Sequence, residues 1–151
     1  MDEIFKDLYA CMKEEKSVFN ILSDEDLIKL SAFFEMKNIP AGDKLWKLED
    51  PYDYIAFIVS GSVEIKKETE FEGKELVVGI YSKCALCILD DSIRTVTAEA
   101  LEDVTLAIIT QINLDKLIDT NPELGAKLLK GMLLTISIRL RKSFDRLAVF
   151  F

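Results

Sequence analysis

The feature that most constrains the fold is a series of short β-forming segments between residues 54 and 109, separated by turns. The run Tyr54–Val59 is apolar throughout and rich in strand formers, but it is too short for a buried helix. Val63 and Ile65 then alternate with charged residues, and glycines 61 and 73 lie in the connections. This spacing of short strands predicts an antiparallel β-barrel of the jelly-roll type, or a sandwich.

Helical patterns flank the β region on both sides. Apolar residues at three- and four-residue spacing predict a helix over about 2–16, and Ser23 is placed to cap a second helix whose first turn is acidic. After the strands, Asn113 is expected to cap a short helix, and Pro122 to open a long one that reaches about residue 149. We therefore expect a mostly β domain with flanking helices. It would be a single domain of 151 residues, with N-terminal helices at 1–35, the β-barrel at 36–112 and C-terminal helices at 113–151.

The composition argues against an enzyme and against a nucleic-acid-binding protein. The chain contains no histidine, which is the commonest general base and metal ligand, and it lacks the glycine motifs of nucleotide-binding enzymes. Its net charge of −8 repels phosphate backbones. Residues 121–151 carry six basic and two acidic side chains, so this part is +4 and the first 120 residues are −12. We interpret the basic part as the solvated face of a helix.

The cysteine count and the hydropathy indicate the compartment. Three cysteines, an odd number, do not suggest a disulfide framework. The first residues lack the basic and apolar regions of a secretory signal, and no apolar run approaches the roughly 20 residues that span a bilayer. We expect a cytoplasmic protein without a membrane segment.

The long C-terminal helix carries a repeating apolar pattern. Its positions follow one another at spacings of 4, 3, 4, 3 and 4, as in a coiled coil: Leu129, Leu133, Ile136, Leu140, Ser143 and Leu147. We call these six residues the seam. A neighbouring stripe of Leu124, Leu128 and Met132 gives the helix a second apolar face. Two faces predict packing on the chain's own β region and on a second copy, as a homodimer through residues 122–149; the alternative is one wide buried face.

Two segments of the β region match known signatures, in order. The first begins at Gly42-Asp43 and continues through the apolar strand to Ser60-Gly61-Ser62-Val63; the second is Leu89–Ala100, in which Arg94 precedes a Thr-Val-Thr-Ala run. Together they resemble the cyclic nucleotide-binding domain family, over about residues 23–142. The resemblance implies a pocket for a cyclic nucleotide such as cAMP or cGMP, in which Arg94 grips the cyclic phosphate and Thr95 adds a donor or touches the base. It also implies a short helix whose first N–H groups face the same anion.

One family position departs from this pattern. The family places a Gly-Glu pair ahead of the arginine, and its glutamate accepts a hydrogen bond from the ribose. Counting back from Arg94 puts Cys84 and Ala85 in those two positions; aligning Ala85-Leu86 with the family's Ala-Leu puts Ser82 and Lys83 there instead. The acid is absent in both alignments. Because a hydrogen bond to a charged acceptor contributes about 1.5–3 kcal/mol, its loss weakens binding about tenfold to a hundredfold.

The arginine, the threonine and the two cysteines of this region each have an alternative interpretation. Arg94 can be a structural arginine held by Asp90 or Asp91, and Thr95 an ordinary strand residue. Cys84 and Cys87 form a Cys-x-x-Cys pair, which we interpret as two core residues; the alternative is a thiol redox or metal site.

Three function classes therefore stay open. They are a regulatory sensor of a cyclic nucleotide or another small anion, a dimerisation or protein-docking module that binds no ligand, and a thiol sensor. The chain is expected to act on another protein rather than on DNA, because no helix-turn-helix pattern follows the long helix.

Overall fold

The computed structural model describes residues 6, 9–10, 21–46, 54–71, 73–82, 85 and 97–149. Helix α2 (Asp24–Ser31) begins where the sequence predicts it. The Ser23 hydroxyl accepts a hydrogen bond from the Asp26 backbone N–H at 3.1 Å, and the Asp26 carboxylate accepts one from the Ser23 N–H at 3.2 Å. This reciprocal pair is a capping box, and it satisfies two N–H groups that the first turn leaves without helical partners. Of the helix predicted over 2–16, Lys6, Tyr9 and Ala10 are helical and the remainder lies outside the described residues.

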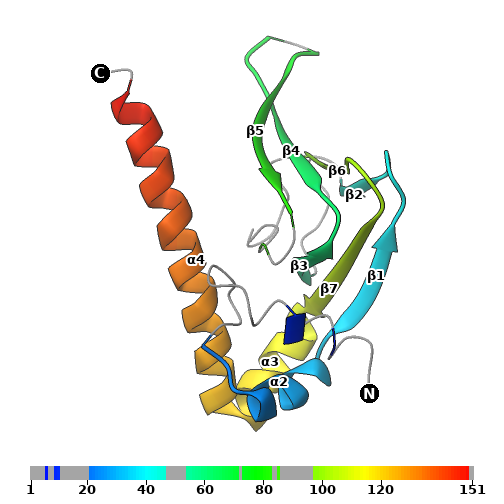
Figure 1. Cartoon of the computed structure of the whole chain (residues 1–151), viewed down its shortest axis with the longest axis vertical. Helices are drawn as coiled ribbons and strands as arrows, with labels where there is room; N and C mark the ends of the chain where they lie inside the picture. Colours follow the sequence, from blue (N-terminus) through cyan, green and yellow to red (C-terminus); the bar gives the residue numbers. More distant parts are fainter. Residues whose placement is uncertain are drawn as a thin grey trace.

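Within the described ranges, seven strands form two antiparallel sheets (Figure 1). The three-stranded sheet has the order β1-β7-β3, and the four-stranded sheet has the order β2-β6-β4-β5. The strands are β1 (Glu35–Ile39), β2 (Lys44–Trp46), β3 (Tyr54–Ser60), β4 (Val63–Glu68), β5 (Glu75–Tyr81), β6 (Thr97–Ala100) and β7 (Val104–Thr110). The predicted fold class is confirmed, but the described strands do not close into a barrel. The two sheets face each other across a layer of side chains instead.

Strand β3 explains why its sequence is an unbroken apolar run. Ile55 and Phe57 point into a cluster formed with the helices, whereas Ala56 and Ile58 point into a second cluster shared with the four-stranded sheet. Every residue from Tyr54 to Val59 is therefore buried. A strand covered on both faces has no solvent side on which polar residues would alternate.

Helix α3 (Gln111–Thr120) follows β7 directly, and its cap differs from the prediction. The cap is Thr110, whose hydroxyl accepts a hydrogen bond from the Asn113 N–H at 3.1 Å. Asn113 lies inside the first turn, and its side-chain amide donates to the Phe33 carbonyl at 3.3 Å. The prediction that Asn113 caps this helix was wrong, because its side chain is used to bind a neighbouring segment.

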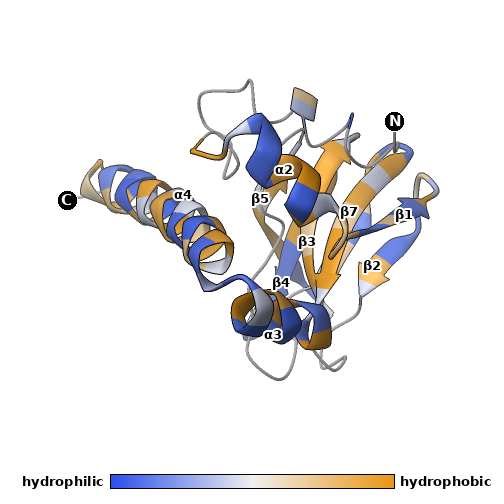
Figure 2. Cartoon of the chain, turned by 90° about the horizontal axis from the view of Figure 1, so that it is seen from below, coloured by the Kyte–Doolittle hydropathy of each residue, from blue (hydrophilic) through white to orange (hydrophobic). Residues whose placement is uncertain are grey.

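Helix α4 (Pro122–Ala148) begins at a proline, as predicted, and Asn121 caps it through a bond from the Leu124 N–H at 3.2 Å. Its first half packs on the core, where Leu124, Leu128 and Met132 are at most 3% exposed. Its second half extends beyond α2 and α3, toward the end of the molecule that the β4–β5 hairpin occupies (Figure 1). Figure 2 shows polar and apolar residues mixed around this half, with no single hydrophobic side turned to the sheets.

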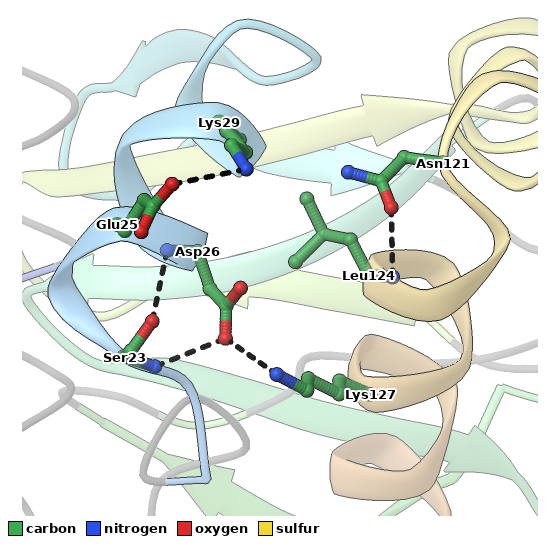
Figure 3. A network of polar contacts seen from close by, with 7 residues as sticks. All are labelled: Ser23, Glu25, Asp26, Lys29, Asn121, Leu124 and Lys127. Atoms are coloured by element: carbon green, nitrogen blue, oxygen red, sulfur yellow. Dashed lines mark hydrogen bonds and ion pairs between the residues drawn. The ribbon is translucent and has the colours of Figure 1, made fainter.

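A polar network ties α2 to the start of α4 (Figure 3). The Lys127 ammonium lies 2.9 Å from the Asp26 carboxylate that also closes the capping box of α2. The hydrogen bond from Lys127 holds the pKa of Asp26 below its ordinary value, and the same bond raises the pKa of Lys127. Each partner therefore favours the charged form of the other, and the pair links the first turn of α2 to the beginning of α4.

Candidate ligand-binding site

The strand order places the two strands that the arginine-containing segment connects. Strands β5 and β6 lie on opposite sides of β4, so that Val63 of β4 pairs with both Tyr81 and Ala100. Residues 82–96 connect the end of β5 to the start of β6. The two strands that this connection joins therefore flank β4.

Ala85, which follows β5, is placed by two backbone hydrogen bonds. Its carbonyl accepts a hydrogen bond from the Ile58 N–H at 2.9 Å, and its own N–H donates to the Ser82 carbonyl at 3.1 Å. Ala85 is partly buried against the cluster that lies between the two sheets. Ile58 belongs to the opposite sheet and the cluster contains residues of both sheets, so Ala85 lies at the boundary between the two sheets.

Of the five predicted ligand-binding residues, Ala85 is the one that the structure describes. Arg94, Thr95, Cys84 and Leu86 lie outside the described residues, as do Cys87, Asp90 and Asp91. Ala85 occupies one of the two candidate positions for the family's glutamate. A side chain at this position begins beside the cluster that the two sheets share.

The glycines of the first signature have a structural explanation. Gly61 has φ of +89°, and a Cβ there would meet the Asp103 carbonyl oxygen and lie 2.8 Å from a methyl group of Val104. Gly42 has φ of +86°, and its N–H donates to the Ala100 carbonyl at 2.8 Å. Both turns therefore pack on the end of β6 and the turn that follows it, and Gly61 fits only because it has no side chain.

One contact near the site was not predicted. The Arg139 guanidinium of α4 lies 4.2 Å from the centre of the Tyr81 ring, at the end of β5. A cation over an aromatic face is attracted to it, so this contact joins the second half of α4 to the strand that leads into the site. The sequence counted Arg139 only as a helix charge. Nothing in the sequence pattern indicates that Tyr81 and Arg139, which are 58 positions apart, are in contact.

An ion pair lies at the start of β6, where the connection 82–96 ends. The Lys66 ammonium of β4 lies 3.3 Å from the Glu99 carboxylate of β6, and this hydrogen bond raises the pKa of Lys66. The pair lies beside Thr97, the first residue of β6, and reinforces the pairing of the two strands. Across the described ranges no three Asp, Glu or Cys side chains are grouped as metal ligands would be. Nor does any described helix combine the length and hydrophobicity that crossing a bilayer requires.

The chain is similar in sequence and in fold to known proteins. The sequence model of the cyclic nucleotide-binding domain matches residues 36–121 of the chain. No curated protein matches the sequence.

Several solved structures share the fold over most of the chain. A cyclic nucleotide-binding domain from Methylobacillus flagellatus aligns with a TM-score of 0.85 and 22% identity, over 97% of this chain and 84% of that one. The N-terminal domain of a transcriptional regulator from Streptomyces coelicolor aligns at 0.71 and 25%, over 91% and 94%. The sensor domain of the transcriptional regulator DNR from Pseudomonas aeruginosa aligns at 0.67 and 22%, over 95% of each chain.

Proposed function

Because the chain belongs to the cyclic nucleotide-binding domain family, we propose that it is a regulatory module that senses a small anionic ligand. The observation that supports the proposal is the position of Ala85, whose carbonyl accepts a hydrogen bond from the Ile58 N–H and which packs against the cluster shared by the two sheets. The similar structures that are named as regulators support a regulatory rather than a catalytic role.

Arg94 is the residue that we assign to the ligand's anionic group. A guanidinium presents paired donors that match phosphate oxygens, and Thr95 beside it can add a hydroxyl donor. Cys84, Ala85 and Leu86 would line the sugar side, where the family's glutamate is missing. We therefore propose that cAMP and cGMP bind weakly and with little preference between them.

Calorimetric titration with cAMP and with cGMP tests this assignment. We expect micromolar or weaker binding, and its loss in Arg94→Ala, because the phosphate contact is the main charged interaction left. Arg141→Ala removes the same charge from an exposed position of α4 and should leave the titration unchanged. Tight binding that distinguishes the two bases would contradict the proposal.

Restoring the missing acid tests the sugar side. Ala85→Glu, or Lys83→Glu in the second alignment, should tighten binding about tenfold by giving the ribose hydroxyl a charged acceptor. The substitution that succeeds identifies the correct alignment. Failure of both would mean that the backbone of this segment, and not the lost carboxylate, prevents binding.

We propose further that the chain is a homodimer through α4. The seam leucines and isoleucine are 38–63% exposed, although their spacing is that of a coiled coil. Sedimentation equilibrium at micromolar protein should give twice 17.2 kDa. Leu133→Asp combined with Leu140→Asp should halve that mass, because a dimer through the seam would remove the two introduced charges from water. A wild-type monomer at every concentration would contradict the proposal.

The second candidate function is a dimerisation and docking module that binds no nucleotide. The missing acid and the exposed seam favour it. The titration distinguishes this module from the sensor. A docking module would be a dimer that gives no heat with either nucleotide and that keeps the same mass when they are added.

A further inference from the structure

One face of α4 changes from apolar to polar at mid-length. Leu128 and Met132 are buried in the core, and the same face continues, at spacings of three or four residues, with Thr135, Arg139 and Ser143. Each of these three polar residues is half-buried, whereas all three residues between Arg139 and Ser143 are exposed. The polar face is therefore the side of the second half of α4 that lies toward the rest of the chain.

Arg139 is the residue of this face that reaches a strand. The Thr135 hydroxyl donates to the Gly131 carbonyl at 3.0 Å, and the Ser143 hydroxyl donates to the Arg139 carbonyl at 3.1 Å. Both hydroxyls therefore bind the backbone of their own helix. The Arg139 guanidinium instead lies 4.2 Å from the centre of the Tyr81 ring. The polar face of α4 thus presents the Arg139 charge to the end of β5.

Tyr81 places this charge next to the candidate site. Tyr81 pairs with Val63, which is buried, so the two side chains share the inner face of their sheet. Tyr81 and Ala85 both pack against the cluster that the two sheets share. Ser82 follows Tyr81 directly, and its carbonyl accepts the hydrogen bond from the Ala85 N–H at 3.1 Å. The guanidinium therefore lies beside the start of the segment to which we assign the ligand.

A guanidinium in this position can bind an anion while it stays on the ring. Contact with an aromatic ring uses the flat face of the group, whereas its five N–H donors point outward in the plane. Five donors are more than one neighbouring group can accept from, and two of them match two oxygens of a phosphate. Because Arg139 is half-buried, less water screens such a contact than at the exposed positions of α4.

The strand and connection next to Arg139 contain few charges. Residues 76–89 include one charged side chain, Lys83, and the next acids are Asp90 and Asp91, close to Arg94 in the sequence. The family's glutamate, which would bring a negative charge to the sugar side of the ligand, is absent. A cyclic phosphate carries one negative charge, which the proposed function assigns to Arg94. Arg139 therefore adds a positive charge that a cyclic phosphate does not neutralise.

We propose that Arg139 is a ligand-binding residue, and that the site prefers a phosphate monoester, which carries two negative charges, to a cyclic phosphate, which carries one. This inference rests on the proposed ligand site and specifies the class of anion that the site binds. Arg139 holds the second charge, and Tyr81 keeps the guanidinium in place beside the segment. The ligand is then an open phosphate ester rather than a cyclic nucleotide.

Two ligands that share their base and sugar test this preference. cAMP and 5′-AMP differ only in the phosphate, which is a cyclic diester in the first and a monoester in the second. In calorimetric titrations near neutral pH and at one ionic strength, 5′-AMP should bind at least about tenfold more tightly, as expected for one added charged hydrogen bond. Arg139→Gln should remove this difference and leave the affinity for cAMP unchanged. Arg141→Gln removes the same charge from an exposed position of α4 and should keep the difference.

The outcomes separate this inference from the proposed function. If neither nucleotide gives heat, the proposed anion site is refuted, and the role of Arg139 with it. If cAMP binds as tightly as 5′-AMP, or more tightly, the preference is refuted while the anion site stands. If Arg139→Gln keeps the preference, or loses both affinities equally, Arg139 is not the residue that holds the second charge.

The pH dependence of the unmodified protein provides a second measurement. The second ionisation of a phosphate monoester has a pKa of about 6, so 5′-AMP loses its second charge between about pH 7 and about pH 5. Its affinity should fall about tenfold over this range, and the affinity for cAMP should stay constant. The chain contains no histidine, and carboxyls and thiols ordinarily titrate near about 4 and about 8.5, so this change reports the charge of the ligand. An equal change for both ligands, or none for 5′-AMP, would overturn the inference.

Discussion

The clearest single-residue prediction concerns Gly61→Ala. Two costs are expected from the structure. The first is the left-handed backbone at φ of +89°, which costs an L-residue about 1–2 kcal/mol and is partly offset by a less flexible unfolded chain. The second is steric, because the new Cβ would meet the Asp103 carbonyl oxygen and lie 2.8 Å from Val104. Overpacking of this kind costs about 1–3 kcal/mol, so we expect a total loss of about 2–4 kcal/mol.

Gly42 provides a matched control for the backbone cost alone. Its φ of +86° is nearly identical, but a Cβ there would have nothing within 4 Å. Gly42→Ala should therefore cost no more than about 1 kcal/mol. Urea unfolding followed by circular dichroism, at one fixed protein concentration, measures both variants. We expect a difference of about 2 kcal/mol, or roughly 4–8 °C in the melting temperature.

Equal losses at Gly42 and Gly61 would refute this reasoning. They would show that the turn after β6 moves aside at little cost, so that contact with Asp103 and Val104 is not what requires glycine at position 61.

Two further predictions concern the helices. Lys127→Met should cost up to about 1 kcal/mol near neutral pH, since Lys127 is 39% exposed and its ion pair is partly screened. The pKa of Asp26 is lowered in the folded protein, so the pair's contribution is complete above the ordinary carboxyl pKa of about 4 and is lost as the pH falls through the lowered value. The difference between variant and wild type in urea unfolding should disappear in acid, and a constant difference would contradict this pairing. Leu128→Ala removes a fully buried side chain and should cost about 2–5 kcal/mol in unfolding experiments. In the Leu133→Asp, Leu140→Asp monomer, the exposed Leu129→Ala should cost under about 1 kcal/mol; similar losses would show that the seam is packed within one chain.

Local chemistry was sufficient to predict most elements of the fold. Ser23 and Pro122 identified two helix starts because capping and the absence of an N–H act within one turn. The apolar run Tyr54–Val59 identified the central strand, since its length and residue types exclude the alternatives. The cap of α3 was predicted wrongly because Thr110 and Asn113 are both good caps. The choice depends on β7 pairing with β3 as far as Thr110, and on the use of the Asn113 amide by Phe33.

For the candidate site too, the sequence determined one part and the tertiary structure determined the other. The two signatures and the absence of the glutamate could be predicted from the sequence, because each is recognised by residue types at fixed spacings. The sequence also gave α4 two apolar stripes, but it contained no information on which stripe the core covers. Packing decided this: Leu128 is buried and Leu133 is 63% exposed, since Met132 is the last described residue of α4 in the core cluster. The contacts of Ala85 with Ile58 and of Arg139 with Tyr81 join residues 27 and 58 positions apart, which only the tertiary fold brings within reach.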